Sequence, residues 1–455
     1  MRNINENPNM SMKKTSMAML PLEERIHTSE EVCLGFTEEE ALAEASRCLN
    51  CPYQYCHLHC PTHNHIPEFI EQIRNKDYEA AWEILSKTNA IMDISCRVCP
   101  YEKQCESHCT RAIKGEPVAI GALERFVSDY HKAHSEKPLK ECKEKNGFKV
   151  AVIGGGPAGI TCAISLALSG FQVSLYEKTN QLGGVTSWGI PSFVLPKDLM
   201  AEHIQNLHNY HVDIHLNTEV GVDISLKALK EENDALFLAI GAEKPIELDI
   251  PDSHLPQVIQ AKDYLCAPEK YPYKNILVIG GGNTAIDAAR TALRQKSTEE
   301  SKILYRRTKA DMPASHAEIA LAEEEGIKIL PLLSPSAFLT KNQDGDEDNL
   351  YGIRCDLMEV ASPDYPGGRN NVAPSGKTEE IPCDLVILAL GFQVRPMEEI
   401  HLDSQNRILI NDDMETSSKM IFAGGDCVSG PATLIKASAA GKEAAAHIFD
   451  KLPLY

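Results

Sequence analysis

The residues best suited to chemistry are cysteines in two closely spaced groups. The first group, C-x2-C-x4-C-x3-C-P, consists of Cys48, Cys51, Cys56 and Cys60. The second group, C-x2-C-x5-C-x3-C, consists of Cys96, Cys99, Cys105 and Cys109. Four thiolates in so short a stretch can surround a compact cuboid [4Fe–4S] cluster. The sequence therefore predicts two such clusters, with structural zinc as the alternative.

The ending x3-C-P of the first group is typical of bacterial ferredoxins, in which the last cysteine of the run binds the other cluster. We therefore expect crossed ligation, in which one cluster is held by Cys60, Cys99, Cys105 and Cys109. The other cluster would keep Cys48, Cys51 and Cys56. Its fourth ligand could be Cys96 or a carboxylate.

A glycine-rich turn, GGGPAG at residues 154–159, follows the apolar strand expected at Lys149–Ile153 and precedes a helix. This G-x-G-x-x-G form suits a tight turn, a close approach to a pyrophosphate at the helix N-terminus, and close helix–strand packing. The second strand, Gln172–Tyr176, leads into an acid that can accept from both ribose hydroxyls. The predicted dinucleotide-binding residues are Gly154, Gly156, Ala158, Gly159 and Glu177. The alternative is a packing turn without a ligand.

A second turn, GGGNTA at residues 280–285, follows the expected strand Asn275–Ile279. Its next strand, Lys302–Tyr305, ends in two arginines rather than an acid. Guanidinium groups at this place suit a 2′-phosphate, so NADPH is favoured over NADH. The predicted binding residues are Gly280, Gly282, Asn283, Thr284, Arg306 and Arg307. The alternative is that the two arginines form only a solvated strand end.

One chain with two such turns usually holds one flavin and one nicotinamide cofactor. The strands Leu236–Ala242 and Leu385–Phe392 run into glycines, as at the crossovers of flavin proteins, and Gly241 lies in the first of them. The strand at Ile421 ends in Gly425-Asp426, so an acid could reach a ribityl hydroxyl; an ordinary helix cap is the alternative. We therefore predict FAD at the first turn and NADPH at the second.

These motifs imply an α/β fold with two Rossmann-like domains after a small helical iron–sulfur domain. Short helices are expected at Glu38–Cys48, Pro67–Arg74 and Tyr78–Leu85, a charged linker at His134–Asn146, and a last helix at Ala432–Phe449. Surface loops are expected at Lys341–Asn349 and Ser362–Lys377, and the strand Asp384–Ala389 should return to the first nucleotide domain. The predicted domains are a flexible tail (1–24), the helical domain (25–146), the FAD domain (147–255 and 378–455) and the NADPH domain (256–377).

Bulk composition narrows the class of protein. The 455 residues carry a net charge of −20, which disfavours nucleic acid and anionic membranes as partners. No run of 18 apolar residues and no apolar leader are present, so we expect a soluble cytoplasmic protein without disulfides. None of the six cysteines after Cys109 forms a C-x2-C or C-x4-C pair, which disfavours a disulfide reductase.

Together the motifs resemble the glutamate synthase small (β) subunit family over most of the chain. The matching segments include RCLNC, HCPTHNHIPEFI, GEPVAIGALERF, VIGGGPAG, GGNTAIDAARTAL, YRRTKADMPA and FAGGDCVSGPAT. The resemblance implies FAD, NADPH and two [4Fe–4S] clusters, with Glu124 as the fourth ligand of the first cluster in place of Cys96. It also implies that Leu182–Trp188, with Gly184, lies near the flavin, and that Ala432 and Thr433 lie at its pyrimidine end.

The resemblance further implies an electron-input subunit that oxidises NADPH and needs a partner. The partner is expected to be a larger FMN-containing subunit or a ferredoxin-like acceptor. Glutamate synthase is the first interpretation. The alternatives are the large subunit of a bifurcating ferredoxin:NADP transhydrogenase and the electron-input part of a dihydropyrimidine dehydrogenase. A nucleotide-binding redox sensor without turnover is a third. No residue is predicted to act as an acid or a base.

Overall fold

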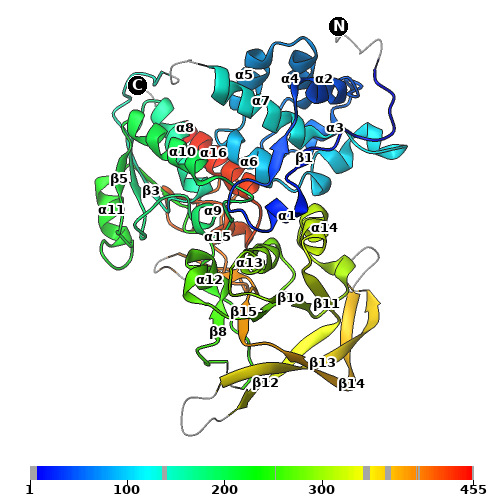
Figure 1. Cartoon of the computed structure of the whole chain (residues 1–455). Coiled ribbons are helices and arrows are strands. Elements are labelled where there is room, and N and C mark those ends of the chain that lie inside the picture. Colours follow the sequence, from blue (N-terminus) through cyan, green and yellow to red (C-terminus); the bar gives the residue numbers. More distant parts are fainter. Residues whose placement is uncertain are drawn as a thin grey trace.

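The computed structural model describes residues 8–135, 141–251, 253–341, 349–363, 370–395, 397 and 400–452. They form three units: a helical unit (8–135), a first sheet unit (148–243 and 394–452) and a second sheet unit (258–390) (Figure 1). The α/β class and the helical N-terminal unit agree with the sequence-based expectation. Residues 136–140 of the expected linker, and residues 342–348 of the loop expected at Lys341–Asn349, lie outside the described residues.

The helical unit is built from short helices around one apolar core. The three predicted helices are present as α2 (Glu38–Ala45), α4 (Ile66–Arg74) and α5 (Tyr78–Ser86). Helix α4 buries Ile66, Phe69, Ile70 and Ile73, which share one face because of their i, i+3, i+4, i+7 spacing. The remaining helices are α3 (Tyr55–Leu58), α6 (Met92–Val98), the 15-residue α7 (Ile120–His134) and three 3-10 turns, η1 (Tyr101–Lys103), η2 (Glu106–His108) and η3 (Thr110–Ile113).

The N-terminal segment is bound to the helical unit over residues 8–24, so the prediction of a flexible tail is wrong for these residues. The Lys14 amide donates to Glu116 at 2.8 Å, and the buried Arg47 donates to the Ser11 carbonyl at 3.2 Å. Strand β1 (Ala18–Met19) pairs with β2 (Cys33–Gly35), and α1 (Leu22–Arg25) lies between them. These long-range polar partners are not visible in a local sequence pattern.

The first sheet has the parallel order β17-β6-β3-β4-β5. Its strands are β3 (Lys149–Ile153), β4 (Gln172–Tyr176), β5 (Asp213–His215), β6 (Ala235–Leu238) and β17 (Ile421–Ala423). The β3 and β4 bounds equal those predicted. The strand order reverses beside β3, and ligands of such sheets bind at the carboxyl ends of the strands at that point.

Two helices that are far apart in the sequence cover the first sheet together. They are α8 (Pro157–Leu168) and α16 (Leu434–Lys451), and they lie side by side. A Cβ on Gly441 would stand 2.0 Å from the Ala158 carbonyl oxygen, so only glycine permits this approach. The same face of the sheet carries α10 (Lys197–Asn209), and α11 (Leu226–Glu232) lies before β6.

The second sheet repeats the arrangement in the order β11-β10-β9-β15-β8. Its strands are β8 (Val258–Gln260), β9 (Asn275–Ile279), β10 (Glu300–Tyr305), β11 (Lys328–Pro331) and β15 (Leu385–Leu388). Helices α12 (Ala261–Cys266), α13 (Asn283–Leu293) and α14 (His316–Glu324) accompany it. The prediction that β15 returns to the first sheet is wrong, because β15 pairs with β8 and β9. A short apolar strand does not reveal which of two similar sheets it joins.

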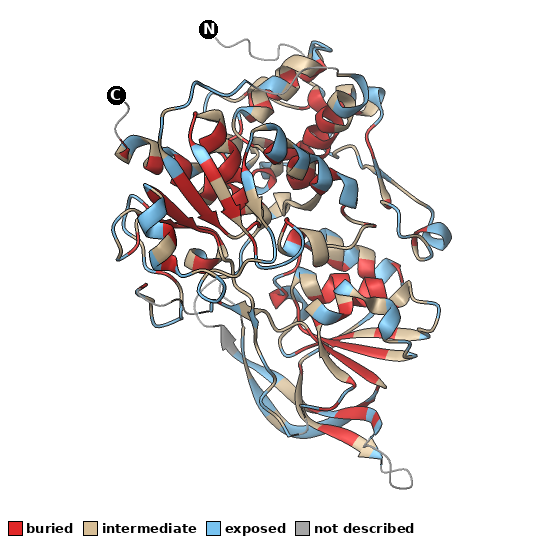
Figure 2. Cartoon of the chain, turned by 90° about the vertical axis from the view of Figure 1, so that its left-hand side faces the viewer, coloured by how far each residue is buried: buried red, intermediate tan, exposed pale blue. Residues whose placement is uncertain are grey.

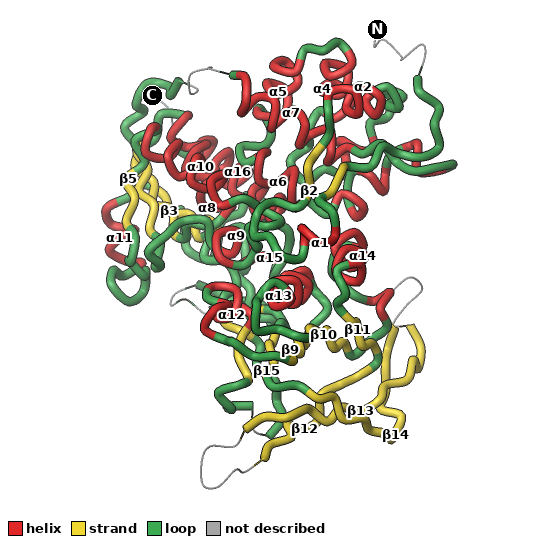
Figure 3. Tube along the Cα trace, in the orientation of Figure 1, coloured by secondary structure: helices red, strands yellow, loops and turns green. Residues whose placement is uncertain are grey.

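A three-stranded antiparallel sheet projects from the second unit. It contains β12 (Leu333–Lys341), β13 (Asn349–Pro363) and β14 (Asn370–Pro382). Figure 2 shows long exposed stretches on these strands, and Figure 3 shows them apart from the helices. The prediction of a surface loop at Ser362–Lys377 is therefore wrong at Ser362–Pro363 and from Asn370 onward. Proline, glycine and asparagine made the segment look like a loop, but an exposed edge strand tolerates these residues.

The two connections between the sheet units pair with each other. They are β7 (Lys244–Pro245) and β16 (Phe392–Gln393), which run antiparallel. Gly241 and Gly391 precede them with φ of +67° and +99°, values that favour glycine. Among the described residues, no helix is long and apolar enough to cross a membrane.

A buried ionic network joins all three units at Glu325. Arg290 donates to its carboxylate at 2.8 and 3.0 Å, and Arg294 donates at 2.9 and 3.1 Å. Arg25 of the helical unit lies 3.6 Å from the same carboxylate and 3.0 Å from Glu324. The guanidinium of Arg294 stacks over Phe193 of the first sheet unit, 3.8 Å from the ring centroid. The network therefore fixes the second sheet unit against the other two.

Candidate cofactor sites

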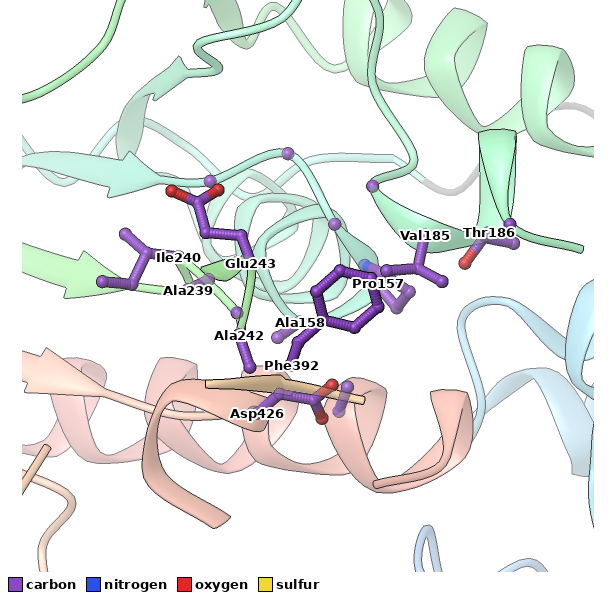
Figure 4. A pocket seen from close by; sticks show the side chains of 18 of the residues that line it. Pro157, Ala158, Val185, Thr186, Ala239, Ile240, Ala242, Glu243, Phe392 and Asp426 are labelled. Carbon is purple, nitrogen blue, oxygen red and sulfur yellow. The ribbon is translucent and has the colours of Figure 1, made fainter. Parts of the chain in front are cut away.

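A cavity of about 870 Å³ lies where the three units meet. Its walls come from the turn after β3, the end of β6, the start of α16 and the start of α13. Figure 4 shows Pro157, Ala158, Val185, Phe392 and Asp426 around this space. A cavity at the carboxyl ends of two parallel sheets is large enough for a dinucleotide and a second ligand.

The first glycine turn has the geometry that its sequence predicts. Gly154 has φ +108°, and a Cβ there would stand 2.3 Å from the Ala239 carbonyl oxygen. A Cβ on Gly159 would stand 1.9 Å from the Gly154 carbonyl oxygen. In contrast, a Cβ on Gly156 would meet nothing within 4 Å, and Gly156 lines the cavity. Gly154 and Gly159 thus serve close packing, and Gly156 leaves room for a ligand at the N-terminus of α8.

Glu177 is a buried carboxylate in the wall of this cavity. Its Oε2 accepts from the Gly155 amide at 2.8 Å, and its Oε1 accepts from the Thr179 amide and hydroxyl at 2.9 and 2.8 Å. These bonds hold the carboxylate next to the glycine turn, where a ribose would lie. The place and orientation of Glu177 fit its predicted role as the acceptor for the ribose hydroxyls.

The other predicted flavin residues also line the cavity. They are Ala158, Gly184, Gly241, Gly425, Asp426, Ala432 and Thr433. Burial raises the pKa of Asp426 to about 6, while the Ala432 amide, which donates to Asp426 at 3.2 Å, lowers it. Asp426 begins α15 (Asp426–Ser429), and Thr433 is the N-cap of α16. Two helix N-termini and an acid therefore face the cavity together, and helix N-termini suit the phosphates of a dinucleotide.

The second turn repeats the geometry of the first. A Cβ on Gly280 would stand 2.3 Å from the Ala389 carbonyl oxygen, and Gly282 again has open space. Asn283 and Thr284 line the cavity, and the Asn283 side chain accepts from the Ser315 amide at 2.9 Å. The turn is therefore open to a second dinucleotide whose reactive end could enter the shared cavity.

Arg306 and Arg307, the two arginines predicted to bind the 2′-phosphate, lie just beyond β10 and outside the cavity lining. Arg306 is exposed, whereas Arg307 is half-buried and donates to the Asn370 carbonyl at 3.2 Å. Arg306 is therefore free of an internal role and suits a phosphate better than Arg307. The sequence pattern alone did not separate the two.

The first set of clustered cysteines lines a small separate cavity. Its thiols are Cys48, Cys51, Cys56 and Cys109. Burial, together with the neighbouring thiols Cys109 and Cys51, raises the pKa of Cys48 and of Cys56 to about 12. Bound iron favours thiolates, so this donor set fits a [4Fe–4S] cluster. We call it the distal set.

The second set consists of Cys60, Cys99, Cys105 and Glu124. Burial raises the pKa of Cys99 and Cys105 well above the usual value, and the nearby Glu124 and Cys60 raise it further. Burial also raises the pKa of Glu124 to about 7, although hydrogen bonds from Asn64 at 3.1 Å and Tyr101 at 3.3 Å lower it. Three thiols and one carboxylate thus meet in a buried place that fits a second cluster. We call it the proximal set.

The structure groups the ligands differently from the predicted partition in the fourth member of each set. Cys109 was expected with Cys60, Cys99 and Cys105, but it lies with the distal set. Glu124 was expected with the first cluster, but it lies with the proximal set. Crossing between the groups does occur, because the last cysteine of each group joins the other set. Helix α7 brings Glu124 to its place, which cysteine spacing cannot reveal.

Cys96 belongs to neither set. It is buried in α6, and its thiol donates to the Asp93 carbonyl at 3.2 Å. Among the residues that the structure describes, no three histidines, cysteines or carboxylates are close enough for a single metal ion. The ligands of a [4Fe–4S] cluster bind different iron atoms and therefore stand farther apart than those of one ion.

The proximal set lies directly beside the large cavity. Cys99 and Pro100 form part of the cavity wall, together with Arg97 and Val98. Cys99, at the end of α6, thus belongs to the proximal set, and its neighbours line the large cavity. Cysteine spacing predicted the three thiols of this set together, but not that they border the large cavity.

Several cavity residues were missed by sequence reasoning. Asp287, one helical turn after Asn283, lines the cavity, and burial raises its pKa well above the usual value, with Glu318 adding to the effect. Lys197 lies near Asp287, and burial lowers the pKa of Lys197 to about 8. The helical period from Asn283 could have found Asp287, but nothing local points to Lys197.

Replacing Glu177 with alanine is expected to weaken FAD binding about 10- to 100-fold. The change removes a charged acceptor, and hydrogen bonds to charged groups contribute about 1.5–3 kcal/mol. The measurement is the dissociation constant of FAD from the full-length protein, followed by flavin fluorescence. Glu243→Ala is the matched control, because this carboxylate lines the same cavity but is paired with Lys178. Equal losses in the two variants would contradict the role of Glu177.

Comparison with known families gives two matches along the chain. Residues 25–136 match the family described as dihydropyrimidine dehydrogenase domain II, 4Fe-4S cluster. Residues 148–441 match the pyridine nucleotide-disulphide oxidoreductase family. The boundary between the two matches falls between the helical unit and the first sheet unit.

Known proteins resemble the chain over most of its length. It is 33% identical to the glutamate synthase [NADPH] small chain of Halomonas elongata, over 95% of each chain. It is 36% identical to the putative oxidoreductase AegA of Escherichia coli, over 95% of this chain and 69% of AegA. It is 33% identical to the NADP(+)-dependent formate dehydrogenase subunit beta of Moorella thermoacetica, over 86% of this chain and 59% of that subunit.

A solved structure shares the fold of the two sheet units. FprA of Mycobacterium tuberculosis, in complex with NADPH, superimposes with a TM-score of 0.58 at 18% identity. The match covers 67% of this chain and 84% of FprA. At this identity the likeness concerns the fold alone.

Proposed function

Because the chain belongs to the glutamate synthase small-chain family of NADPH-dependent oxidoreductases, we propose that it is the electron-input subunit of a glutamate synthase. In this role it oxidises NADPH and supplies electrons to a larger FMN-containing subunit that makes glutamate from glutamine and 2-oxoglutarate. The observation that carries the proposal is the match to a small chain along 95% of both proteins.

Family membership confirms the predicted cofactor types, which are FAD, NADP and [4Fe–4S] iron–sulfur. When bound, FAD accepts a hydride from NADPH, and iron–sulfur clusters carry single electrons. We assign FAD to the first turn, Glu177 and Asp426, and NADPH to the second turn and Arg306. Two clusters are assigned to the distal and proximal sets.

The chain's own residues orient the two dinucleotides relative to each other and to the proximal set. The glycine turns leave space at two helix N-termini that lie at one shared cavity, so both dinucleotides can be held with their reactive ends close together. The walls include the aromatic side chains of Trp188 and Phe392, whose ring centroids lie 6.1 Å apart. Cys99 stands in the wall of the same cavity, which supports an outlet for electrons through the proximal set.

Replacing Arg306 with alanine is expected to raise the KM for NADPH about 10- to 100-fold and to leave the KM for NADH nearly unchanged. The guanidinium would lose its charge-assisted bonds to the 2′-phosphate, which NADH lacks. The measurement is steady-state reduction of a small artificial acceptor with either donor. Arg354→Ala is the control, because Arg354 is exposed on β13 and paired with Glu380. A similar change with both donors would exclude Arg306 from 2′-phosphate recognition.

A second candidate function is electron input to another redox enzyme. It is favoured by the 33% identity to a formate dehydrogenase beta subunit, of which this chain covers 59%. The shared electron-input module explains why such relatives match. The two candidates differ only in the partner protein.

The test is anaerobic affinity purification of the tagged chain from its native organism, with identification of the co-purifying protein. We expect a large FMN-containing amidotransferase and NADPH-driven formation of glutamate from glutamine and 2-oxoglutarate. Co-purification of a different dehydrogenase, without glutamate formation, would refute the glutamate synthase assignment and leave NADPH oxidation intact.

A further inference from the structure

Exposed apolar side chains gather around the distal cluster set. Of the 14 large apolar residues that are exposed in the described part of the chain, six lie here: Met10, Met12, Tyr53, Tyr55, Leu58 and Ile113. Tyr53 and Ile113 are 76% and 77% exposed. Concentrated apolar exposure of this kind marks a surface that another protein covers. We call these six residues the exit face.

The segments of the exit face touch one another around the distal cysteines. Tyr53 and Tyr55 line the same small cavity as Cys56 and Cys109. Ile113 ends η3, which begins directly after Cys109. Met12 reaches this end of the unit because its carbonyl accepts from the Glu116 amide at 2.8 Å. Tyr53, Tyr55, Ile113 and Met12 therefore lie beside the distal set.

The segments around the exit face lack the acidic residues that are in excess in the whole protein. The chain carries a net charge of −20, yet residues 51–65 and 107–115 contain no aspartate or glutamate. Exposed Lys13 and Lys114 lie within this region instead. Glu116, at its edge, accepts from the Lys14 amide at 2.8 Å. A face without carboxylates in an acidic protein suits a partner whose own contact surface is acidic.

We infer that the exit face is the docking surface for the electron-accepting protein, and that this acceptor presents apolar groups and carboxylates around its redox centre. The inference rests on the proposed function, because electrons must leave through the distal set for the surface to matter. Aromatic and methionine side chains are typical of interface centres, and the lysines would orient the acidic acceptor during encounter.

The test uses the full-length holoprotein and the double variant Met12→Glu/Ile113→Glu, which adds two carboxylates to the exit face. Leu409→Glu is the matched control, since Leu409 is 48% exposed and lies in the first sheet unit. The probe acceptors are flavodoxin, a small acidic FMN protein, and cytochrome c, a basic haem protein. Binding to the oxidised holoprotein is measured by calorimetry, and kcat/KM is measured with NADPH as donor.

For the wild-type protein we expect tighter binding to flavodoxin than to cytochrome c. In the double variant, flavodoxin binding and kcat/KM should fall at least about tenfold, with reduction of a small viologen dye unchanged and the control unaffected. Flavodoxin binding that is equal in the double variant and the control, or a wild-type preference for cytochrome c, overturns the inference. Loss of NADPH oxidation in the wild type would instead refute the proposed function, and the binding data would still decide the docking surface.

Discussion

Replacing Glu325 with glutamine is expected to destabilise the protein by about 3–5 kcal/mol, because the change leaves buried guanidinium groups without their shared carboxylate. Arg290 and Glu325 are fully buried in their side chains, and Arg294 is nearly so. Burial raises the pKa of Glu325, but the hydrogen bonds from Arg290 and Arg294 lower it to a value below the usual range. Glutamine keeps the size of the side chain, removes the charge and replaces one acceptor oxygen with an amide donor that faces the guanidinium groups.

The destabilisation caused by Glu325→Gln should extend beyond the second sheet unit, because the network joins all three units. Arg294 donates to the Arg25 carbonyl at 2.7 Å and stacks on Phe193, so its position depends on both other units. The Val32 amide also donates to the Phe193 carbonyl at 3.0 Å. A charge imbalance at Glu325 therefore loosens the contact that positions the second turn over the shared cavity.

Differential scanning calorimetry of the holoprotein measures this effect. We expect the first unfolding midpoint to fall by at least about 6 °C, given about 2–4 °C per kcal/mol for a unit of this size. Glu323→Gln is the control, since Glu323 pairs with Lys309 near the surface and such pairs contribute about 0–1 kcal/mol. Similar midpoints for the two variants would show that the network does not hold the units together.

Local pattern predicted the nucleotide-binding parts of the fold well. The strands β3, β4 and β9 have the predicted bounds, because each is a short apolar run and β3 and β9 end at a glycine turn. Gly154 and Gly280 have no room for a side chain in these turns, so the glycine pattern alone indicates where the tight turns lie. The choice of sheet for β15 was missed, since it depends on contacts with β8 and β9.

The network at Glu325 could not be predicted from the sequence. Arg25 and Glu325 are 300 residues apart, and each looks like an ordinary surface charge in its own segment. Only the packing of α1 against α14 removes them from water (Figure 1). The grouping of the cluster ligands differs from the prediction for a similar reason, because α7 brings Glu124 from outside both cysteine groups.

The two cluster sets make a second prediction with a large effect. Cys109→Ala should abolish the same cluster as Cys51→Ala, and Glu124→Ala should alter the same cluster as Cys105→Ala. Each cysteine variant is expected to lose about half of the iron, because a [4Fe–4S] cluster normally needs all four ligands. The measurements are iron content and the electron paramagnetic resonance spectrum of the reduced holoprotein, in which the two clusters give different signals.

Cys96→Ala is the matched control, since Cys96 is a buried thiol that belongs to neither set. It should keep full iron content and both signals. If Cys109→Ala instead removed the signal that Cys105→Ala removes, the ligation expected from ferredoxin-like spacing would be correct and the distal set would be wrong.

The same variants also distinguish the roles of the two sets in electron transfer. In Cys109→Ala, NADPH should still bleach the flavin and reduce the cluster at the proximal set, because Cys99 in the cavity wall is unchanged. Flavodoxin reduction should be lost in that variant, since the exit face lies beside the distal set. In Cys105→Ala the flavin should still bleach, but neither the distal cluster nor flavodoxin should be reduced at a comparable rate. A distal cluster that is reduced normally in Cys105→Ala would mean that electrons bypass the proximal set.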